Sequence, residues 1–321
     1  MTAQLVAPGV SGLQGEPNAD ALRNPLRRYF LATRPPFVTL TLVGCLLGIA
    51  TAHADGISIN LLTAVATVML GVTLNAAVNV HNDYCDHMNG TDALNTARVF
   101  PFTGGSRFIQ NGVLTPRATL LFARALFALT IAGGLALCAW VGSGLLWIGL
   151  WGVFVGWAYS APPLQMNSRG LGEICVALTF ALVVVGADFV QRGSLGATPI
   201  WASVGYALLT TNVLYINQFP DRDADLAAGK RHWVARMPVS QARWGYLIIV
   251  VLGLLAMALP VLLGALPPGA ALGMIALVPA ATAAVGLLRF ATMPKQLAPA
   301  IKMTIVAAHI AAVAMSVGLW L

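Results

Sequence analysis

The sequence predicts an all-α polytopic membrane protein in which nine transmembrane helices surround a central cavity. The 321-residue chain is 58% hydrophobic and only 9% charged, with a mean hydropathy of +0.79, whereas soluble globular proteins carry about 25% charged residues. Its apolar residues form nine runs near the length of about 20 residues that a helix needs to cross a bilayer. These runs lie near 36–54, 58–80, 117–139, 144–161, 171–190, 198–217, 242–262, 270–287 and 299–320.

The segments outside these runs divide the chain into two parts. Residues 1–35 are polar and lack the pattern of a signal peptide, so we expect a cytoplasmic N-terminal segment followed by a membrane domain over 36–321. Two long links, 81–116 and 218–241, follow the second and sixth runs. Links of this length are uncommon unless they are functional, so we predict two cap loops of short helices over a cytoplasmic opening. Their spacing of four runs indicates a possible four-plus-four helix repeat.

The positive charges predict the orientation of the chain. With the N-terminus inside, 17 of the 18 Lys and Arg, Arg34 among them, fall on the inner side, and only Arg192 falls on the outer side. Cytoplasmic loops carry an excess of Lys and Arg, so we predict a cytoplasmic N-terminus and an external C-terminus. The protein is expected in the plasma or inner membrane if the cell is prokaryotic. The net charge of +7 is explained by these loops and indicates no nucleic-acid partner.

The second apolar run ends in a cluster of amides and carboxylates. At 100° per residue, Asn79, Asn82, Asp83 and Asp86 share one helix face within an arc of about 100°. Gly90 is expected to end this helix, which lets Asp92 fold back towards the same place. Ionisable groups in such an apolar setting indicate a functional site.

The sixth run ends in a second cluster with a related spacing. Asn217, Asp221 and Asp225 follow each other at intervals of four residues and share one helix face, whereas Asp223 points away from it. Pro220 lies between them and is expected to kink or locally unwind the helix.

The two clusters together predict a metal site. Carboxylates near helix C-termini are disfavoured by the macrodipole and would repel one another without a cation. Oxygen ligands without paired His or Cys suit Mg²⁺, which commonly binds carboxylates together with substrate phosphates. We therefore predict that the clusters face each other across one magnesium–diphosphate site whose metal ligands are Asp83, Asp86, Asp221 and Asp225. Asn79, Asn82, Asp92 and Asn217 are predicted to assist in binding. A solvated acidic cap is the alternative for either cluster alone.

Basic and aromatic residues near the clusters are candidates for substrate binding. Gly lets the backbone approach a phosphate, and Lys and Arg add donors and charge. Beside Gly residues of the links lie four such candidates, for which an ordinary cytoplasmic anchor is the alternative: Arg107, Arg169, Lys230 and Arg231. Tyr84 and Tyr159 could line the cavity and stabilise a carbocation through their ring faces, with ordinary packing as the alternative.

At these residues the chain resembles the UbiA superfamily of intramembrane aromatic prenyltransferases. Asn82-Asp83-x-x-Asp86, with Asp92, is similar to the first aspartate motif of that family. Asn217-x-x-x-Asp221-x-x-x-Asp225, followed by Gly229-Lys230-Arg231, is similar to the second. The first motif and Thr103-Gly104-Gly105 are most similar to the 1,4-dihydroxy-2-naphthoate polyprenyltransferase branch, which makes menaquinone precursors. The sequence differs from that branch at Val99-Phe100-Pro101-Phe102, where a more polar segment is usual.

The resemblance implies an enzyme that transfers a polyprenyl group from its diphosphate to an aromatic acceptor. It implies Mg²⁺ as cofactor, a lipid bilayer as environment and no required protein partner. If the acceptor is 1,4-dihydroxy-2-naphthoate, loss of the ring carboxylate would accompany the transfer. Prenylation of a 4-hydroxybenzoate, homogentisate or porphyrin-type acceptor remains open. A cation-coupled transporter is an alternative of another class, but its site would lie nearer the membrane centre than these clusters do.

Overall fold

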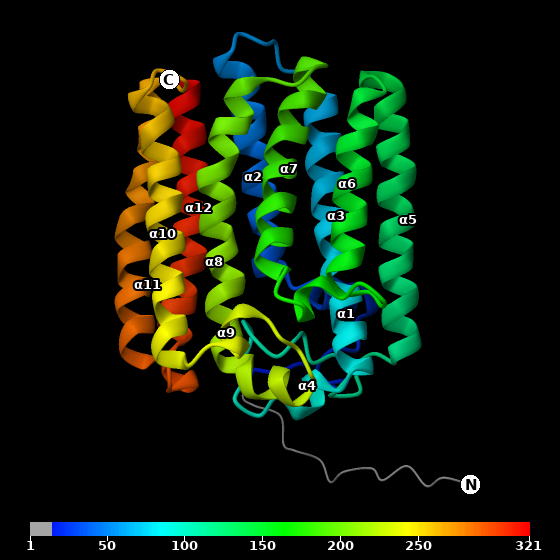
Figure 1. Ribbon diagram of the computed structural model, residues 1–321. Helices are drawn as coiled ribbons and strands as arrows, with labels where there is room; N and C mark the ends of the chain where they lie inside the picture. The colour runs from blue at the N-terminus through cyan, green and yellow to red at the C-terminus, as the bar shows by residue number, and fades with distance from the viewer. Residues whose placement is uncertain (1–14) are drawn as a thin grey trace, which may run out of the picture.

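A computed structural model describes residues 15–321, which form helices and connecting loops without a strand. The long helices stand side by side in one upright bundle (Figure 1). Seven of them are long and apolar enough to cross a membrane, in agreement with an all-α membrane protein. They are α2 (Pro35–Ala54), α3 (Leu61–Met88), α5 (Pro116–Val141), α7 (Gly172–Arg192), α10 (Val239–Leu262), η2 with α11 (Pro268–Phe290) and α12 (Ala298–Trp320).

Each of the nine predicted spans coincides with a helical segment of the described residues. Two of these segments fall outside the group of seven. α6 (Gly144–Ser160) is apolar but has only 17 residues, and α8 (Ala197–Ala227) carries Thr210, Thr211 and Asn212 in its middle. The eighth span begins as the 3₁₀ helix η2 (Pro268–Ala276) and continues as α11 (Leu277–Phe290). Pro279 lies in the first turn of α11, where a missing N–H removes no helical bond.

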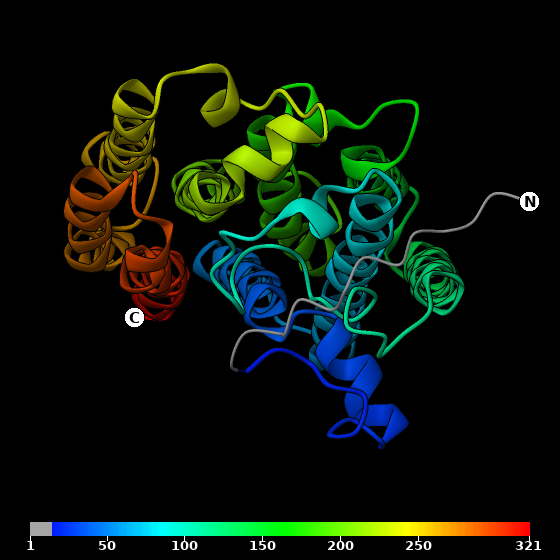
Figure 2. The same cartoon turned by 90° about the horizontal axis from the view of Figure 1, so that it is seen from below.

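The two helices that carry the acidic clusters end in the same way. α3 ends at Met88 and α8 at Ala227, and each is followed by a glycine with φ +84°, Gly90 and Gly229. Each glycine leads towards a four-residue helix, α4 (Thr91–Leu94) or α9 (Trp233–Arg236), and both short helices lie at the same end of the bundle (Figures 1 and 2). The prediction that Gly90 ends its helix is confirmed, and both long links contain short helices.

Pro220 does not unwind its helix. α8 continues through this residue as one α-helix of 31 residues, so the expected local unwinding is wrong, whereas a kink at Pro220 stays a prediction. Proline removes a single backbone hydrogen bond. Pro220 and its neighbours Gln218 and Phe219 are all buried, so packing around this turn offsets the loss and keeps the helix whole.

The described part of the N-terminal segment packs against the first long link. The short helix α1 (Pro25–Ala32) places Ala32 in a small apolar cluster with Leu22, Phe108 and Val113. Glu16 also forms a buried ion pair with Arg98 at 2.6 Å. Residues 15–34 therefore brace the loop that follows α4. The remainder of the predicted segment, 1–14, lies outside the described residues.

Small residues allow the central helices to approach closely. A Cβ atom on Gly48 of α2 would lie 2.1 Å from the Val184 carbonyl oxygen of α7, and one on Gly269 of η2 would lie 1.9 Å from the Gly318 carbonyl oxygen of α12. Helix pairs within membranes commonly use small residues in this way. The contact at Gly48 fixes α2 against α7, and both helices line the cavities described below.

We expect Gly48→Ala to destabilise the protein, because the methyl group would overlap the backbone of α7. Overpacking of this kind costs about 1–3 kcal/mol, which thermal unfolding in detergent would register as a lower melting temperature. Gly149→Ala on α6 is the matched control, since a Cβ atom there has no neighbour within 4 Å. Equal melting temperatures for the two variants would contradict the assignment of Gly48 to a tight helix contact.

Candidate active site

Lys230 joins the two acidic clusters. Its Nζ lies 2.8 Å from Asp86 Oδ1 at the end of α3 and 3.1 Å from Asp225 Oδ1 at the end of α8. Gly229 turns the chain after α8, so that Lys230 points back between the two helices. The ammonium group is buried and holds two carboxylates of different helices together. The predicted juxtaposition of the clusters is thus present in the structure.

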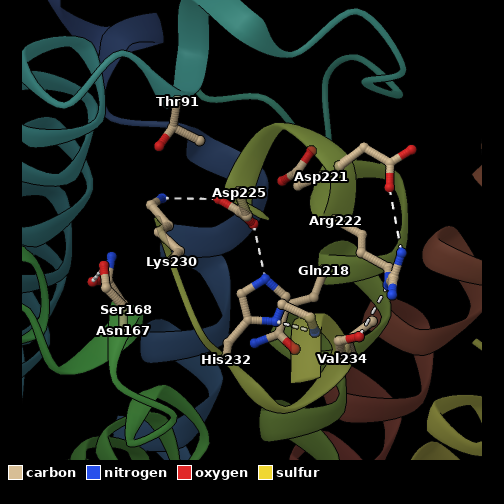
Figure 3. Close-up of polar contacts among 12 residues, drawn as sticks. Thr91, Asn167, Ser168, Gln218, Asp221, Arg222, Asp225, Lys230, His232 and Val234 are labelled. Carbon is tan, nitrogen blue, oxygen red and sulfur yellow. Dashed lines mark hydrogen bonds and ion pairs between the residues drawn. The ribbon is translucent and has the colours of Figure 1, made fainter. Parts of the chain in front are cut away.

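Further polar contacts fix the two carboxylates of α8. His232 places Nε2 3.1 Å from Asp225 Oδ2, so that Lys230 and His232 contact the two oxygens of this carboxylate (Figure 3). Asn95 Nδ2 donates to Asp221 Oδ1 at 2.6 Å, and the Gly104 N–H donates to Asp221 Oδ2 at 3.4 Å. Both carboxylates are therefore oriented by residues of the two long links.

The clusters line one small polar cavity of about 110 Å³. It lies between the ends of α3 and α8 and the loops that follow them. Carboxylate and amide residues from both sides make up half of its lining, and the side chains of Arg34 and Lys230 lie among them. The lining includes Arg34, Asn82, Asp86, Thr91, Asp92, Asn95, Gly104, Gly105, Tyr159, Asn217, Gln218, Asp221, Asp225, Lys230 and His232.

Two glycines let the loop after α4 reach this cavity. Gly104 and Gly105 have φ angles of +75° and +72°, a conformation that side chains rarely adopt. A Cβ atom on Gly105 would lie 2.7 Å from Asp92 Oδ2 and 3.1 Å from Asp83 Oδ1. The glycine pair therefore brings the backbone of the loop directly against the carboxylates of the first cluster.

The donor set of this cavity fits a hard divalent cation. Asn95 Oδ1, Asn217 Oδ1 and Gln218 Oε1 are buried oxygens without a hydrogen-bond partner among the described residues, although buried polar atoms are normally paired. Within residues 15–321, no three of His, Cys, Asp and Glu come close enough together to hold a metal ion by themselves. Oxygen ligands from both walls, completed by substrate phosphate, match the coordination that Mg²⁺ prefers.

The loop residues of the site have strongly shifted pKa values. Burial lowers the pKa of Lys230, but Asp86 and Asp225 outweigh it and hold the pKa above the usual range of lysine. Burial raises the pKa of Asp92 well above its usual range, and the nearby carboxylates of Asp86 and Asp83 raise it further. Lys230 is therefore charged, and a cation entering the cavity would lower the energy of ionised Asp92.

Apart from Asn79, which lines the neighbouring apolar cavity, five predicted site residues lie outside the cavity wall. Asp83 is buried behind it, where Oδ1 accepts a hydrogen bond from the Ser106 N–H at 3.1 Å. Arg107 is also buried behind the wall and donates to the Asp92 carbonyl oxygen. Arg169 and Arg231 are exposed, and Tyr84 is half-buried away from the cavity. Direct substrate or metal contact by these five residues stays a prediction.

The polar cavity adjoins an apolar one of about 200 Å³. Asn82, Tyr159 and Asn217 line both, and Asn79 lines the apolar cavity, where its Nδ2 donates to Asn75 Oδ1 and the Thr33 carbonyl oxygen. A third cavity of about 270 Å³ shares part of its lining with the second and extends towards α5. The residues that line both of these apolar cavities are Gly71, Leu74, Gly152, Thr179 and Val183.

A charged cavity at one end of an apolar helix bundle, beside apolar cavities between the helices, is the arrangement expected of a membrane enzyme. A model of the UbiA prenyltransferase family matches residues 40–315. The chain belongs to this family and is an integral membrane prenyltransferase.

Curated relatives are 27–28% identical to this chain over the aligned regions. A 2-carboxy-1,4-naphthoquinone phytyltransferase of Synechocystis is 28% identical over 70% of this chain and 71% of its own length. A 1,4-dihydroxy-2-naphthoate octaprenyltransferase of Escherichia coli is 28% identical over 70% of this chain and 73% of its own length. The enzyme of the same name from Bacillus subtilis is 27% identical over 62% of each chain.

Solved structures share the fold at lower identity. A UbiA homologue from Aeropyrum pernix, solved in its apo form, superposes with a TM-score of 0.64 at 17% identity, over 87% of this chain and 98% of its own. A UbiA homologue from Archaeoglobus fulgidus bound to DMAPP and Mg²⁺ gives a TM-score of 0.55 at 16% identity, over 90% of this chain and 99% of its own.

Lys230→Met should destabilise the protein by up to about 3–5 kcal/mol, because it removes the cation between the buried Asp225 and the half-buried Asp86. Mg²⁺ should restore part of this loss, since it can take the place of the ammonium group between Asp86 and Asp225. Melting temperatures in detergent with and without Mg²⁺ would measure both effects. Lys295→Met, at an exposed position of η3, is the control. A Lys230 variant as stable as the control, and indifferent to Mg²⁺, would contradict the bridging role.

Proposed function

We propose that this enzyme transfers a polyprenyl group from its diphosphate to 1,4-dihydroxy-2-naphthoate, or to a closely related naphthoate, with Mg²⁺ as cofactor. The observation that carries the proposal is that the charged cavity and the apolar cavity share part of their wall. Asn82, Tyr159 and Asn217 lie where the charged cavity meets the apolar one, so a bound amphiphile would cross this boundary at its reactive bond. The names of the relatives support a naphthoate acceptor.

We further propose that nine helices span the membrane with the site at the cytoplasmic face. α6 and α8 complete the bundle beside the seven apolar helices. The basic residues of the two long links lie at the end that carries α4 and α9, whereas Arg192 lies at the other end of α7, paired with Asp55. This distribution follows the excess of Lys and Arg on the cytoplasmic side.

The diphosphate head would be held in the polar cavity. Lys230 supplies one positive charge there, and the Gly104–Gly105 loop brings backbone close to the same place. Asp86, Asp221 and Asp225, with the unpartnered amide oxygens of Asn95, Asn217 and Gln218, would hold Mg²⁺. Mg²⁺ neutralises charge that develops on the diphosphate as it leaves. Asp83 would act through the loop, since it binds the Ser106 N–H.

The reaction exchanges one bond for another. The bond between C1 of the prenyl group and oxygen breaks, and its electron pair leaves with the diphosphate. An electron-rich carbon of the acceptor ring forms a new bond to C1. The ring then loses its carboxylate as CO₂, and the electrons of the broken bond restore its aromaticity. The ring face of Tyr159, which lines both cavities, can stabilise the positive charge on C1.

The apolar cavities would hold the tail and keep water away from the reacting carbon. On α3 their lining reaches from Asn82 back to Thr67, a separation of 15 residues and about 22 Å of helix at 1.5 Å per residue. Exclusion of water strengthens electrostatic interactions and prevents hydrolysis of a reactive carbocation. A tail in this position is therefore compatible with prenyl transfer rather than diphosphate hydrolysis.

Asp86→Asn and Asp221→Asn should each lower prenyl transfer by about 100-fold or more, the usual loss when a group that stabilises transition-state charge is removed. The assay would follow diphosphate release and prenylated product by mass spectrometry, with 1,4-dihydroxy-2-naphthoate as acceptor in lipid nanodiscs. Chelation of divalent metal should stop turnover of the unmodified enzyme, and Mg²⁺ should restore it.

Asp223→Asn is the matched control for these variants, because Asp223 lies on the same helix with its side chain 90% exposed. It should keep full activity. Normal turnover of both Asp86→Asn and Asp221→Asn, or turnover that survives chelation, would rule out the proposed metal site.

A further inference from the structure

Arg34 points into the active site instead of out towards water. It is the residue that precedes α2, where a basic side chain at a predicted membrane boundary would serve as a cytoplasmic anchor. In the structure it lines both the polar cavity and the adjoining apolar cavity of about 200 Å³. No other arginine or lysine of the described residues lines both. Its side chain therefore lies at the shared wall of the two cavities, where the two substrates would meet under the proposed function.

The backbone at Arg34 is held in an unfavourable conformation. Its φ and ψ angles of 60° and 64° lie in the left-handed region, which costs a residue with a side chain stability and is found most often at functional sites. The turn places the side chain across the Phe37 ring, with Cζ 4.7 Å from the ring centroid. The strained backbone at Arg34 thus accompanies a fixed position of the guanidinium group over the Phe37 ring.

The guanidinium group has unused hydrogen-bonding capacity. Nη2 donates to the Phe102 carbonyl oxygen at 3.2 Å, whereas Nε is buried and has no partner among the described residues. Within residues 15–321, no Asp or Glu forms an ion pair with Arg34. The Asp83 carboxylate lies within electrostatic range of Arg34 without contacting it directly, so the unpaired N–H of the guanidinium group can bind an anion at the edge of the apolar cavity.

The surroundings indicate which anion this is. A planar guanidinium pairs with a carboxylate through two parallel hydrogen bonds, and the Phe37 ring beside it can pack against another aromatic ring. The diphosphate has its own cation in Lys230, which lies with Asp86 and Asp225 in the polar cavity and does not line the apolar one. An aromatic ring that carries a carboxylate matches the two groups at this position, because its carboxylate can pair with the Arg34 guanidinium and its ring can pack against Phe37.

We propose that Arg34 binds the carboxylate of the aromatic acceptor and makes the enzyme select carboxylated acceptors. This inference rests on the proposed function. It assigns a role to a residue outside both aspartate motifs, and it explains why the left-handed turn before α2 is occupied by arginine rather than glycine.

The test compares kinetic constants of Arg34→Gln and Arg34→Gly with those of the unmodified enzyme in nanodiscs. Arg34→Gly keeps the left-handed turn without strain, so it separates loss of binding from loss of folding. The acceptors are 1,4-dihydroxy-2-naphthoate and 1,4-naphthalenediol, which lacks the carboxylate. Both variants should raise the KM of the naphthoate by about 10- to 100-fold, as expected for a lost charge-assisted hydrogen bond. The KM of the prenyl diphosphate and that of the diol should change less than about twofold.

Arg27→Gln is the control for loss of a positive charge, because Arg27 is exposed on α1, and it should leave all constants unchanged. A rise in the KM of the prenyl diphosphate instead of the naphthoate would make Arg34 a diphosphate ligand and overturn the proposal. Unchanged constants would overturn it as well. If the unmodified enzyme prenylates neither acceptor, the proposed function itself has failed.

Discussion

The position of Lys230 between Asp86 and Asp225 is the interaction on which the site depends. α3 and α8 both end in carboxylates, and without a cation these ends would repel each other in an environment of low polarity. The ammonium group, at 2.8 and 3.1 Å from the two side chains, allows the ends to meet. Its loop must return sharply after α8, which Gly229 with φ +84° permits. The other contacts of the cavity form around this bridge.

Hydrophobic patterning predicted the helices well, because whether a segment can cross a membrane depends on its own length and hydropathy. The same is true of the acidic faces, since Asp86, Asp221 and Asp225 follow from helical spacing and do line one cavity. Pro220 shows the limit of local reasoning. Proline disfavours a helix interior, yet α8 continues through Pro220, which is buried with Gln218 and Phe219. Such packing cannot be read from the segment itself.

The parts of the site that sequence reasoning missed come from loops. Asp83 shares its helix face with Asp86, but the loop at Gly105 and Ser106 covers it, which helical spacing could not predict. Asp92 does line the cavity, as expected from the turn at Gly90. Asn95 and His232, which orient Asp221 and Asp225, have no periodic signal. Arg34 did carry one signal, because Pro35 and Pro36 mark the start of a helix and leave Arg34 at its boundary. The direction of its side chain into the cavities, which follows the left-handed turn, is seen only in the structure.

Both helices that carry the acidic clusters end at the polar cavity, and this favours a metal ion at the proposed diphosphate site. A helix N-terminus attracts phosphate through its free N–H groups and dipole, so it would hold a diphosphate without help. α3 and α8 instead present their C-terminal ends together with carboxylates, and this arrangement repels a polyanion. Arg34 and Lys230 line the cavity together with Asp86, Asp92, Asp221 and Asp225, so acidic side chains outnumber the basic ones and disfavour a polyanion. Under the proposed function, a divalent cation would therefore accompany the diphosphate and would be in place to neutralise the leaving charge before the bond breaks.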